Sequence, residues 1–263
     1  MAEDPKLSRL HRPYYRNGPE HRDGADVSFH DIVKLFGFRT ATIGKWVSKQ
    51  EQQLAANLFF DALCDLMDIL NVPERVISLN GNLSLAFGSG GNKHSSAHYE
   101  SNSKTLALAK NAGGGALAHE WMHAFDHYIC DKLFTHSKQD EFASVVWLTD
   151  RTMRPHLLNE KLDQSFTTIF LSEDSRSASD YVQRSALVDQ HLDNFYYAQP
   201  QELLARAFEA CIQDHPVKNA FLVQGTKQSP EAKLGIYPQA KLRQSISLKL
   251  LDYFCHLGQA ISK

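Results

Sequence analysis

The sequence contains few of the features that mark secreted, membrane-embedded or disulfide-stabilised proteins. Only four cysteines occur among its 263 residues, and no two of them form a CxxC pair. Cysteines spaced this widely are typical of buried thiols in a reducing compartment, and not of a disulfide framework or a thiolate metal site. No uninterrupted apolar run is long enough to cross a bilayer, and the first ten residues lack the apolar core of a signal peptide. We therefore expect a cytoplasmic protein without a membrane partner.

The chain also lacks a strong excess of charge. Its formal net charge is −2 at pH 7, so no global field favours nucleic acid or an anionic membrane surface, and we predict no nucleic-acid partner. A hydrophobic content of 43% and a charged content of 22% are those of an ordinary globular protein. Residues 1–27 are rich in Arg and His without apolar periodicity, which predicts a polar N-terminal arm. Residues 28–263 are then expected to form a single domain.

The first half of the chain carries one strong helix signal and several strand signals. Residues 48–70 have apolar residues at helical spacing, and Ser48 with Glu51 forms a capping box at their start. Between residues 74 and 109, the segments "RVISL", "LSLAFG", "SAHYE" and "TLALA" are short, apolar or alternating, and predict three or four strands. Asn80-Gly81 is a plausible hairpin turn between the first two.

Helical periodicity dominates the remainder of the chain. Helices are predicted near residues 115–134, 139–149, 174–190, 200–214 and 239–258, with a break at 224–238 that contains Gly and Pro. The expected fold class is therefore α+β, with a small mixed sheet followed by a central helix and a mostly helical C-terminal part.

The central helix contains an HExxH motif within "GGGALAHEWMHAFDHYI", residues 113–129. His119 and His123 are four residues apart, so both imidazoles lie on one helix face and can bind one cation. Glu120 is turned by about 100° from His119, where a general base can reach a metal-activated water. Asp126 lies on the histidine side, where a carboxylate can accept an imidazole N–H and fix the ring. A buried helix with hydrogen-bonded histidines is the alternative, but burying so many ionisable groups without a cation is costly.

The three glycines before this helix and the strand ahead of them have more ordinary interpretations. Gly113 to Gly115 are expected to allow close backbone approach and do not form a phosphate-binding loop, because the Lys-Ser/Thr element is missing. His94, His98 and Tyr99 either line a cleft or serve sheet packing and loop polarity, and the second interpretation is favoured.

A third metal ligand is not supplied by the residues directly after HExxH. The metzincin pattern requires Gly and His at the positions that Asp126 and Ile129 occupy here. Two-His-one-Glu zinc sites take a glutamate from a later helix instead. The best candidate is Glu202 in "PQELLARAFEACIQD", with Arg206 and Glu209 on the same helix face. From spacing alone, a solvated Glu202–Arg206 pair on an amphipathic helix is an equal alternative.

Several motifs together resemble a known family. "FGFR", "SLNGNLSLAFGSGG", "AHYE", "GGGALAHEWMHAFDHY" and "PQELLARAFEACI" occur here in the order found in a metallopeptidase-like domain of large polyvalent proteins of phages and conjugative elements. Related small stand-alone bacterial proteins carry the label CLCA_X. The likeness covers roughly residues 28–130 and 194–214. It implies a zincin-like fold, a zinc cofactor and an association with mobile genetic elements.

A more distant resemblance is to the catalytic domain of anthrax lethal factor. There, HEFGH is followed by Ala and by an Asp three residues on, and a later EFFAEAF helix carries the zinc-binding Glu. This likeness implies Glu202 as the third ligand, with Arg206 where that enzyme has Glu. A tyrosine seven residues before the ligand helps to stabilise the oxyanion there. Phe195 stands at that position here, so Tyr196 or Tyr197 is implied for the role.

The sequence hypothesis is therefore a gluzincin-like zinc metallopeptidase that hydrolyses peptide bonds of a peptide or protein substrate. His119, His123 and Glu202 would hold Zn²⁺, and Glu120 would act as the base. Glu209 would orient a histidine or pair with the neighbouring arginine. The alternative from another class is a catalytically inactive, metal-stabilised binding or interaction module of a mobile genetic element.

Overall fold

The computed structural model describes residues 9–89, 97–109 and 114–262, and residue contacts divide the chain into two compact units. The first unit comprises Met1–Ile69, Pro73–Ala124 and Pro216–Gln224, and the second comprises Leu70–Val72, Phe125–His215 and Gly225–Lys263. Helix α4 (Leu117–Leu133), which carries the HExxH motif, begins in the first unit and ends in the second.

The first unit contains a four-stranded mixed sheet in the order β1-β2-β4-β3. β1 pairs with β2 and β2 with β4 in parallel, whereas β3 runs antiparallel to β4 at one edge. The strands are β1 (Ala41–Ile43), β2 (Ser84–Phe87), β3 (Ala97–Glu100) and β4 (Thr105–Leu108). The prediction of an α+β protein with a small mixed sheet is confirmed.

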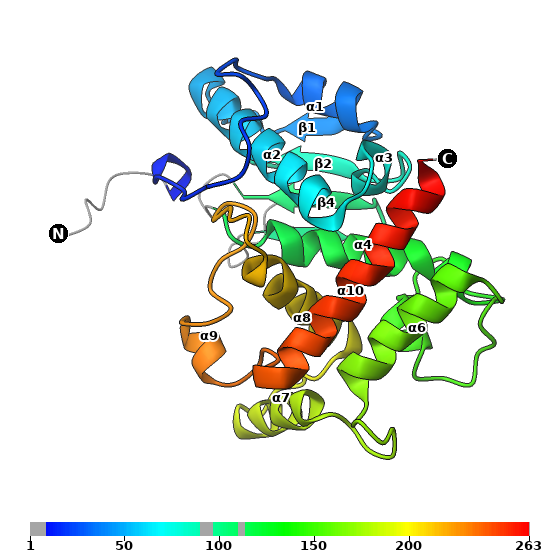
Figure 1. The fold of residues 1–263 in the computed structure, drawn as a ribbon. Helices are drawn as coiled ribbons and strands as arrows, with labels where there is room; N and C mark the ends of the chain where they lie inside the picture. Colours follow the sequence, from blue (N-terminus) through cyan, green and yellow to red (C-terminus); the bar gives the residue numbers. More distant parts are fainter. Residues whose placement is uncertain (1–8, 90–96, 110–113, 263) are drawn as a thin grey trace. The chain divides into compact units, whose positions relative to one another are not determined.

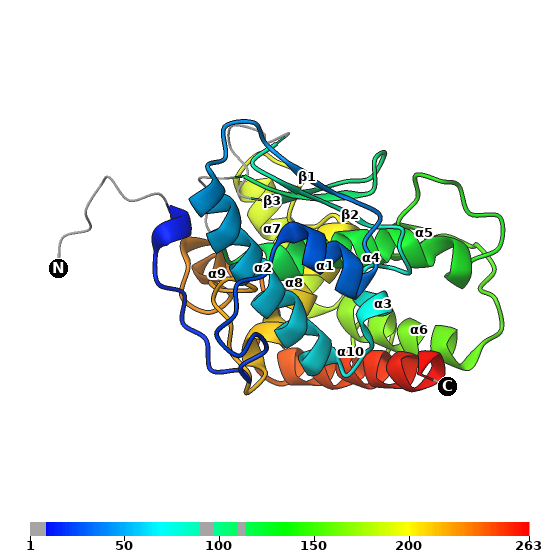
Figure 2. The ribbon, with the colours of Figure 1, turned by 90° about the horizontal axis from the view of Figure 1, so that it is seen from above.

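Two helices of the first unit pack on this sheet through aromatic side chains. Phe29 of α1 (Phe29–Phe36) and Phe59 of α2 (Lys49–Leu70) both contact Phe87 of β2, with ring centroids 5.9 and 6.3 Å apart. Figures 1 and 2 show both helices beside the strands. The predicted helix over residues 48–70 is confirmed, together with its capping box, because Ser48 N–H donates to Glu51 and Glu51 N–H donates to the Ser48 hydroxyl.

The first predicted strand and its hairpin turn are wrong. "RVISL" contributes to a short helix, α3 (Glu74–Ile77), which begins directly after Pro73 and buries Val76 and Ile77. Asn80 and Gly81 do adopt positive φ angles of 56° and 76°, but the turn leads from α3 into β2. The sheet gains β1 instead, a three-residue strand too short to give an alternating pattern.

The described part of the predicted N-terminal arm contacts α2 through ion pairs. Arg16 donates from Nε and Nη2 to the two carboxylate oxygens of Asp65 at 2.7 and 2.8 Å, and Arg22 binds Asp61 in the same bidentate way. Asp65 is fully buried and also accepts a hydrogen bond from Asn219. These contacts connect residues 16–22, α2 and the 216–224 segment within the first unit. The division of the chain into an arm and a single domain stays a prediction.

The second unit is helical. α10 (Ala240–Ile261) packs along α6 (Leu157–Phe170) and also contacts α8 (Pro200–Asp214) (Figures 1 and 2). The helix predicted over residues 200–214 matches α8. The sequence does not predict α6, and α5 and α9 are only one turn long. The helices, with the short N-terminal 3-10 helix of the first unit, are η1 (Arg9–His11), α5 (Ala143–Val146), α6 (Leu157–Phe170), α7 (Asp180–His191), α8 (Pro200–Asp214), α9 (Pro230–Lys233) and α10 (Ala240–Ile261).

Across the residues that the structure describes, no helix combines the length and the apolar character that crossing a bilayer would need.

Candidate metal centre

The start of α4 is held by the 216–224 segment of the same unit. Ala118 N–H, one of the first-turn donors that a helix leaves without an internal partner, donates to the carbonyl of Leu222 at 3.0 Å. A Cβ on Gly114 would lie 2.6 Å from the Cα of Phe221, so only glycine allows this approach. Gly114 therefore allows the backbone before α4 to approach the backbone at Phe221, as predicted for this run of glycines. Gly113 lies outside the described residues.

The two histidines of the motif face each other on α4. Their Nε2 atoms are 3.0 Å apart and their ring planes meet at 79°. His123 is buried and His119 is half-buried. Two imidazole nitrogens on one tetrahedral zinc would lie ~3.3 Å apart, given Zn–N bonds of ~2.0–2.1 Å. The pair is therefore already close to the spacing that a shared cation requires.

Glu120 is attached to the sheet. Its Oε2 accepts a hydrogen bond from the backbone N–H of Tyr99 in β3 at 2.7 Å. The contact uses the Tyr99 backbone, so the packing role that the sequence favours for this residue stays a prediction. His98, its neighbour in β3, is half-buried, and His94 lies outside the described residues.

Asp126 is buried and binds the first turn of α5. Its two oxygens accept hydrogen bonds from the backbone N–H and the hydroxyl of Ser144, at 2.8 and 2.5 Å. This contact ties the second half of α4 to α5. The proposed hydrogen bond from a histidine to Asp126 stays a prediction.

On α8, Glu202 and Arg206 form a buried ion pair. Arg206 Nη2 donates to Glu202 Oε2 at 2.8 Å, and the two residues are only 7% and 5% exposed. The alternative of a solvated pair on an amphipathic helix is therefore wrong, because the pair faces the protein interior. Burial is the largest influence on Arg206 and opposes its charge, but the carboxylate of Glu202 and three nearby tyrosines together raise the pKa of the guanidinium on balance.

The two candidate tyrosines lie in the turn before α8. Asp189, buried at the end of α7, accepts hydrogen bonds from the backbone N–H groups of Tyr196, Tyr197 and Ala198 at 3.1, 2.9 and 2.8 Å. Both tyrosine rings lie over the guanidinium of Arg206, with its Cζ 5.0 and 4.9 Å from their centroids. The sequence did not point to Asp189, because nothing local links a carboxylate in a helix to three amides beyond its end.

Glu209 lies two turns further along α8 and is also buried. The hydroxyl of Tyr237 donates to Glu209 Oε2 at 3.2 Å. Burial, followed by the negative charge of Glu209, raises the pKa of Tyr237. Tyr237 thus stays protonated and can donate this hydrogen bond at any physiological pH. Sequence reasoning missed it, since the contact joins positions 28 residues apart.

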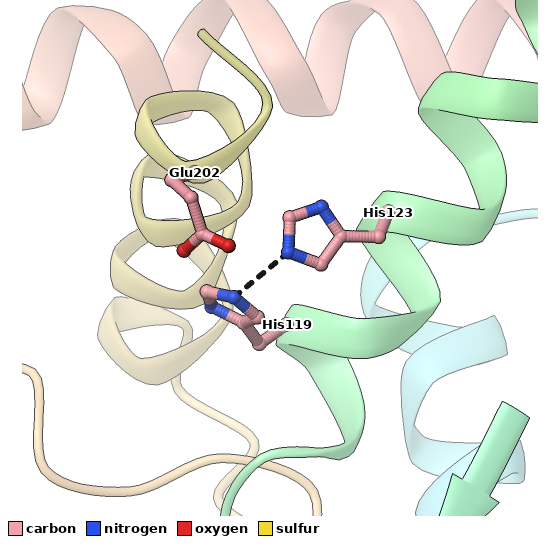
Figure 3. Close-up of side chains that lie close together, drawn as sticks. All are labelled: His119, His123 and Glu202. Atoms are coloured by element: carbon pink, nitrogen blue, oxygen red, sulfur yellow. Dashed lines mark hydrogen bonds between the residues drawn. The ribbon is translucent and has the colours of Figure 1, made fainter. Parts of the chain in front are cut away.

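The structure brings three of the predicted residues together. One ligand atom from each of His119, His123 and Glu202 lies within 4.8 Å of the other two (Figure 3). Two imidazole nitrogens and one carboxylate oxygen are a donor set found in catalytic zinc sites. This His/His/Glu cluster could therefore bind a metal ion.

A comparison with known families finds a match to one part of the chain. The model of large polyvalent protein-associated domain 1 matches residues 188–261, which include α8, α9 and α10. The chain resembles large polyvalent protein domains over this part, and the match overlaps the predicted likeness at residues 194–214. No curated protein and no solved structure gives a significant match to the chain.

Proposed function

We propose that this protein is a zincin-like, zinc-dependent metallopeptidase, in which His119, His123 and Glu202 hold the metal. The observation that carries the proposal is the grouping of these three donors in Figure 3. It is supported by the position of Glu120 next to the first histidine, since a binding site for zinc alone has no use for an adjacent carboxylate base.

The Glu202–Arg206 pair is compatible with metal ligation. A carboxylate has two oxygens, and Arg206 holds Oε2. The other oxygen can serve as a single-atom ligand, as in sites with two His and one Glu. The chemistry of the three donors therefore fits zinc.

The chain's own groups supply the remaining steps of peptide hydrolysis. When bound, zinc supplies a Lewis acid that lowers the pKa of a water to about 7. Glu120 would take the proton of the attacking water and deliver it to the amine that leaves. The Tyr99 amide, which holds one oxygen of Glu120, would orient the carboxylate for this transfer. Tyr196 or Tyr197 is the candidate for a hydrogen bond to the developing oxyanion.

A second candidate is a metal-stabilised interaction module of a mobile genetic element that lacks turnover. One observation favours it: the family match at residues 188–261 includes Glu202 but does not reach the HExxH helix. Under this alternative, the three donors would bind metal to stabilise the protein, and Glu120 would have no chemical role.

A cleavage screen separates the two candidates. Purified protein and its Glu120→Gln variant are incubated with a denatured proteome, with and without a chelator, and new peptide ends are identified by mass spectrometry. The peptidase predicts new ends that require both the metal and Glu120. Zinc-loaded protein that produces no new ends would exclude the peptidase and favour the interaction module.

A further inference from the structure

We infer that Arg206 is a positioning residue that restricts Glu202 to one metal-binding oxygen, and that Tyr196 and Tyr197 act through Arg206 by covering it with their rings. This inference rests on the proposed metal site. It assigns the two tyrosines a role that differs from hydrogen bonding to the oxyanion.

The first part of the inference comes from how Arg206 holds Glu202. Arg206 Nη2 donates to Glu202 Oε2 at 2.8 Å, and Arg206 Nη1 donates to the backbone carbonyl of Glu202 at 3.4 Å. Both side chains are buried, so water does not compete for the contact. A charge-assisted hydrogen bond in such surroundings is strong and directional. Arg206 therefore fixes the orientation of the carboxylate and keeps Oε2 engaged.

The consequence concerns the number of ligand atoms. A catalytic zinc site has three protein ligands and leaves a position open for water. A glutamate that bound through both oxygens would compete for that position. Because Oε2 is engaged by Arg206, Glu202 offers one oxygen and the open position is preserved.

The second part comes from the two tyrosines. The Cζ of Arg206 lies 5.0 Å from the ring centroid of Tyr196 and 4.9 Å from that of Tyr197, within the ~6 Å at which a cation is attracted to a ring face. Tyr196 and Tyr197 are held in place by their backbone amides on Asp189. The rings can thus restrain the guanidinium without using their hydroxyl groups.

The test compares zinc affinity in full-length variants by competition with a chelator. Arg206→Met should weaken zinc binding by ~10–100-fold, the usual loss when a group that orients a ligand is removed. Arg206→Lys keeps the charge without the planar guanidinium and should recover part of that loss. The absorption spectrum of Co²⁺-loaded protein gives an independent measure, since its visible bands weaken as the coordination number rises. Arg206→Met should weaken these bands, because Glu202 can then bind through both oxygens.

Paired tyrosine variants separate the rings from the hydroxyls. The double change of Tyr196 and Tyr197 to Phe keeps both rings and should leave zinc affinity and the cobalt spectrum unchanged. The double change to Leu removes the rings and should move both readouts toward those of Arg206→Met. If the Phe pair weakens zinc binding as much as the Leu pair, the role of the rings is overturned.

Arg243→Met is the control, because it breaks an ion pair at the other end of α8, between the buried Arg243 and the half-buried Asp214. Arg243 binds both oxygens of Asp214, ~18 Å along the helix axis from Glu202. The Arg243→Met variant should have a lower unfolding temperature and the same zinc affinity as the wild type. Should Arg206→Met fail to fold, Arg206→Gln, which also removes the charge, takes its place, and a zinc affinity and cobalt spectrum like those of the wild type overturn the inference.

The outcomes also distinguish this inference from the proposed function. Wild-type protein that binds zinc with the same affinity as Arg206→Met overturns the positioning role and leaves the metal site standing. Wild-type protein that binds no zinc overturns the proposed function, and the positioning role with it.

Discussion

The carboxylate of Glu120 lies 2.7 Å from the backbone nitrogen of Tyr99, so the predicted base on α4 is joined to β3, an edge strand of the sheet. A hydrogen bond to a main-chain amide fixes a carboxylate more firmly than a bond to a mobile side chain. This contact allows a substitution at Glu120 that changes its chemistry and keeps its position.

Glu120→Gln is expected to abolish turnover without loss of metal. The glutamine oxygen can still accept the Tyr99 N–H, but an amide cannot take up the proton of water, so peptide cleavage should drop by ~10²-fold or more. Cleavage rate and zinc content are measured on the same preparation. Glu100→Gln, an exposed glutamate of the same strand, should leave both unchanged. Unchanged cleavage in Glu120→Gln would show that Glu120 is not the base.

The protein is expected to bind one zinc per chain. His119 and His123 must be neutral to bind a metal, so protons compete with zinc and the metal should be released as the pH falls. Elemental analysis of protein purified without added metal, followed by dialysis at decreasing pH, measures both the stoichiometry and the release. A chain that is metal-free as purified and also fails to take up added zinc would contradict the proposed centre.

Glu202 and Glu209 are expected to differ sharply in their effect on zinc. Seven residues separate them by ~10 Å along α8, so one zinc cannot bind both. Glu202→Ala should weaken zinc binding by more than the ~10–100-fold expected when a group that only orients a ligand is lost, whereas Glu209→Ala should stay within that range.

Tyr237 provides the control for this comparison. Tyr237→Phe removes the hydroxyl that donates to Glu209 and should have at most the effect of Glu209→Ala. Chelator competition measures all three variants. The reverse ranking of the two glutamates would move the ligand to Glu209.

Asp65→Asn is expected to destabilise the first unit. The fully buried carboxylate binds Arg16 through both oxygens and accepts from Asn219. The Arg16 side chain is 18% exposed, so water can solvate its charge, and neutralising Asp65 should cost about 1–3 kcal/mol. Glu173→Gln, which removes an exposed pair with Lys241, should cost less than about 1 kcal/mol. Denaturant unfolding compares the two variants, and equal midpoints would show that the buried pair adds no stability.

Local patterns predicted the elements whose signals lie within one turn or one helix. Residues 48–70 carry a capping box and a continuous apolar stripe, and residues 200–214 begin with a proline suited to the first turn, so α2 and α8 could be located from sequence. The prediction of a strand at "RVISL" is wrong because a five-residue segment with three apolar residues fits a strand or a helix turn equally well. Its one-turn helix buries Val76 and Ile77 together, and Trp121 of α4 donates to the Ile77 carbonyl, a long-range contact that no local pattern contains.

The same distinction applies to the candidate centre. The spacing of His119 and His123 on one helix determined that their imidazoles would meet, because residues four apart lie on one helix face. The packing of α8 determines whether Glu202 reaches the two histidines. It also determines whether Arg206 pairs with Glu202 in water or in the protein interior. Only the tertiary structure decided that the pair is buried and that Tyr196 and Tyr197 cover Arg206, since burial and cation–ring contacts arise from segments that approach each other in space.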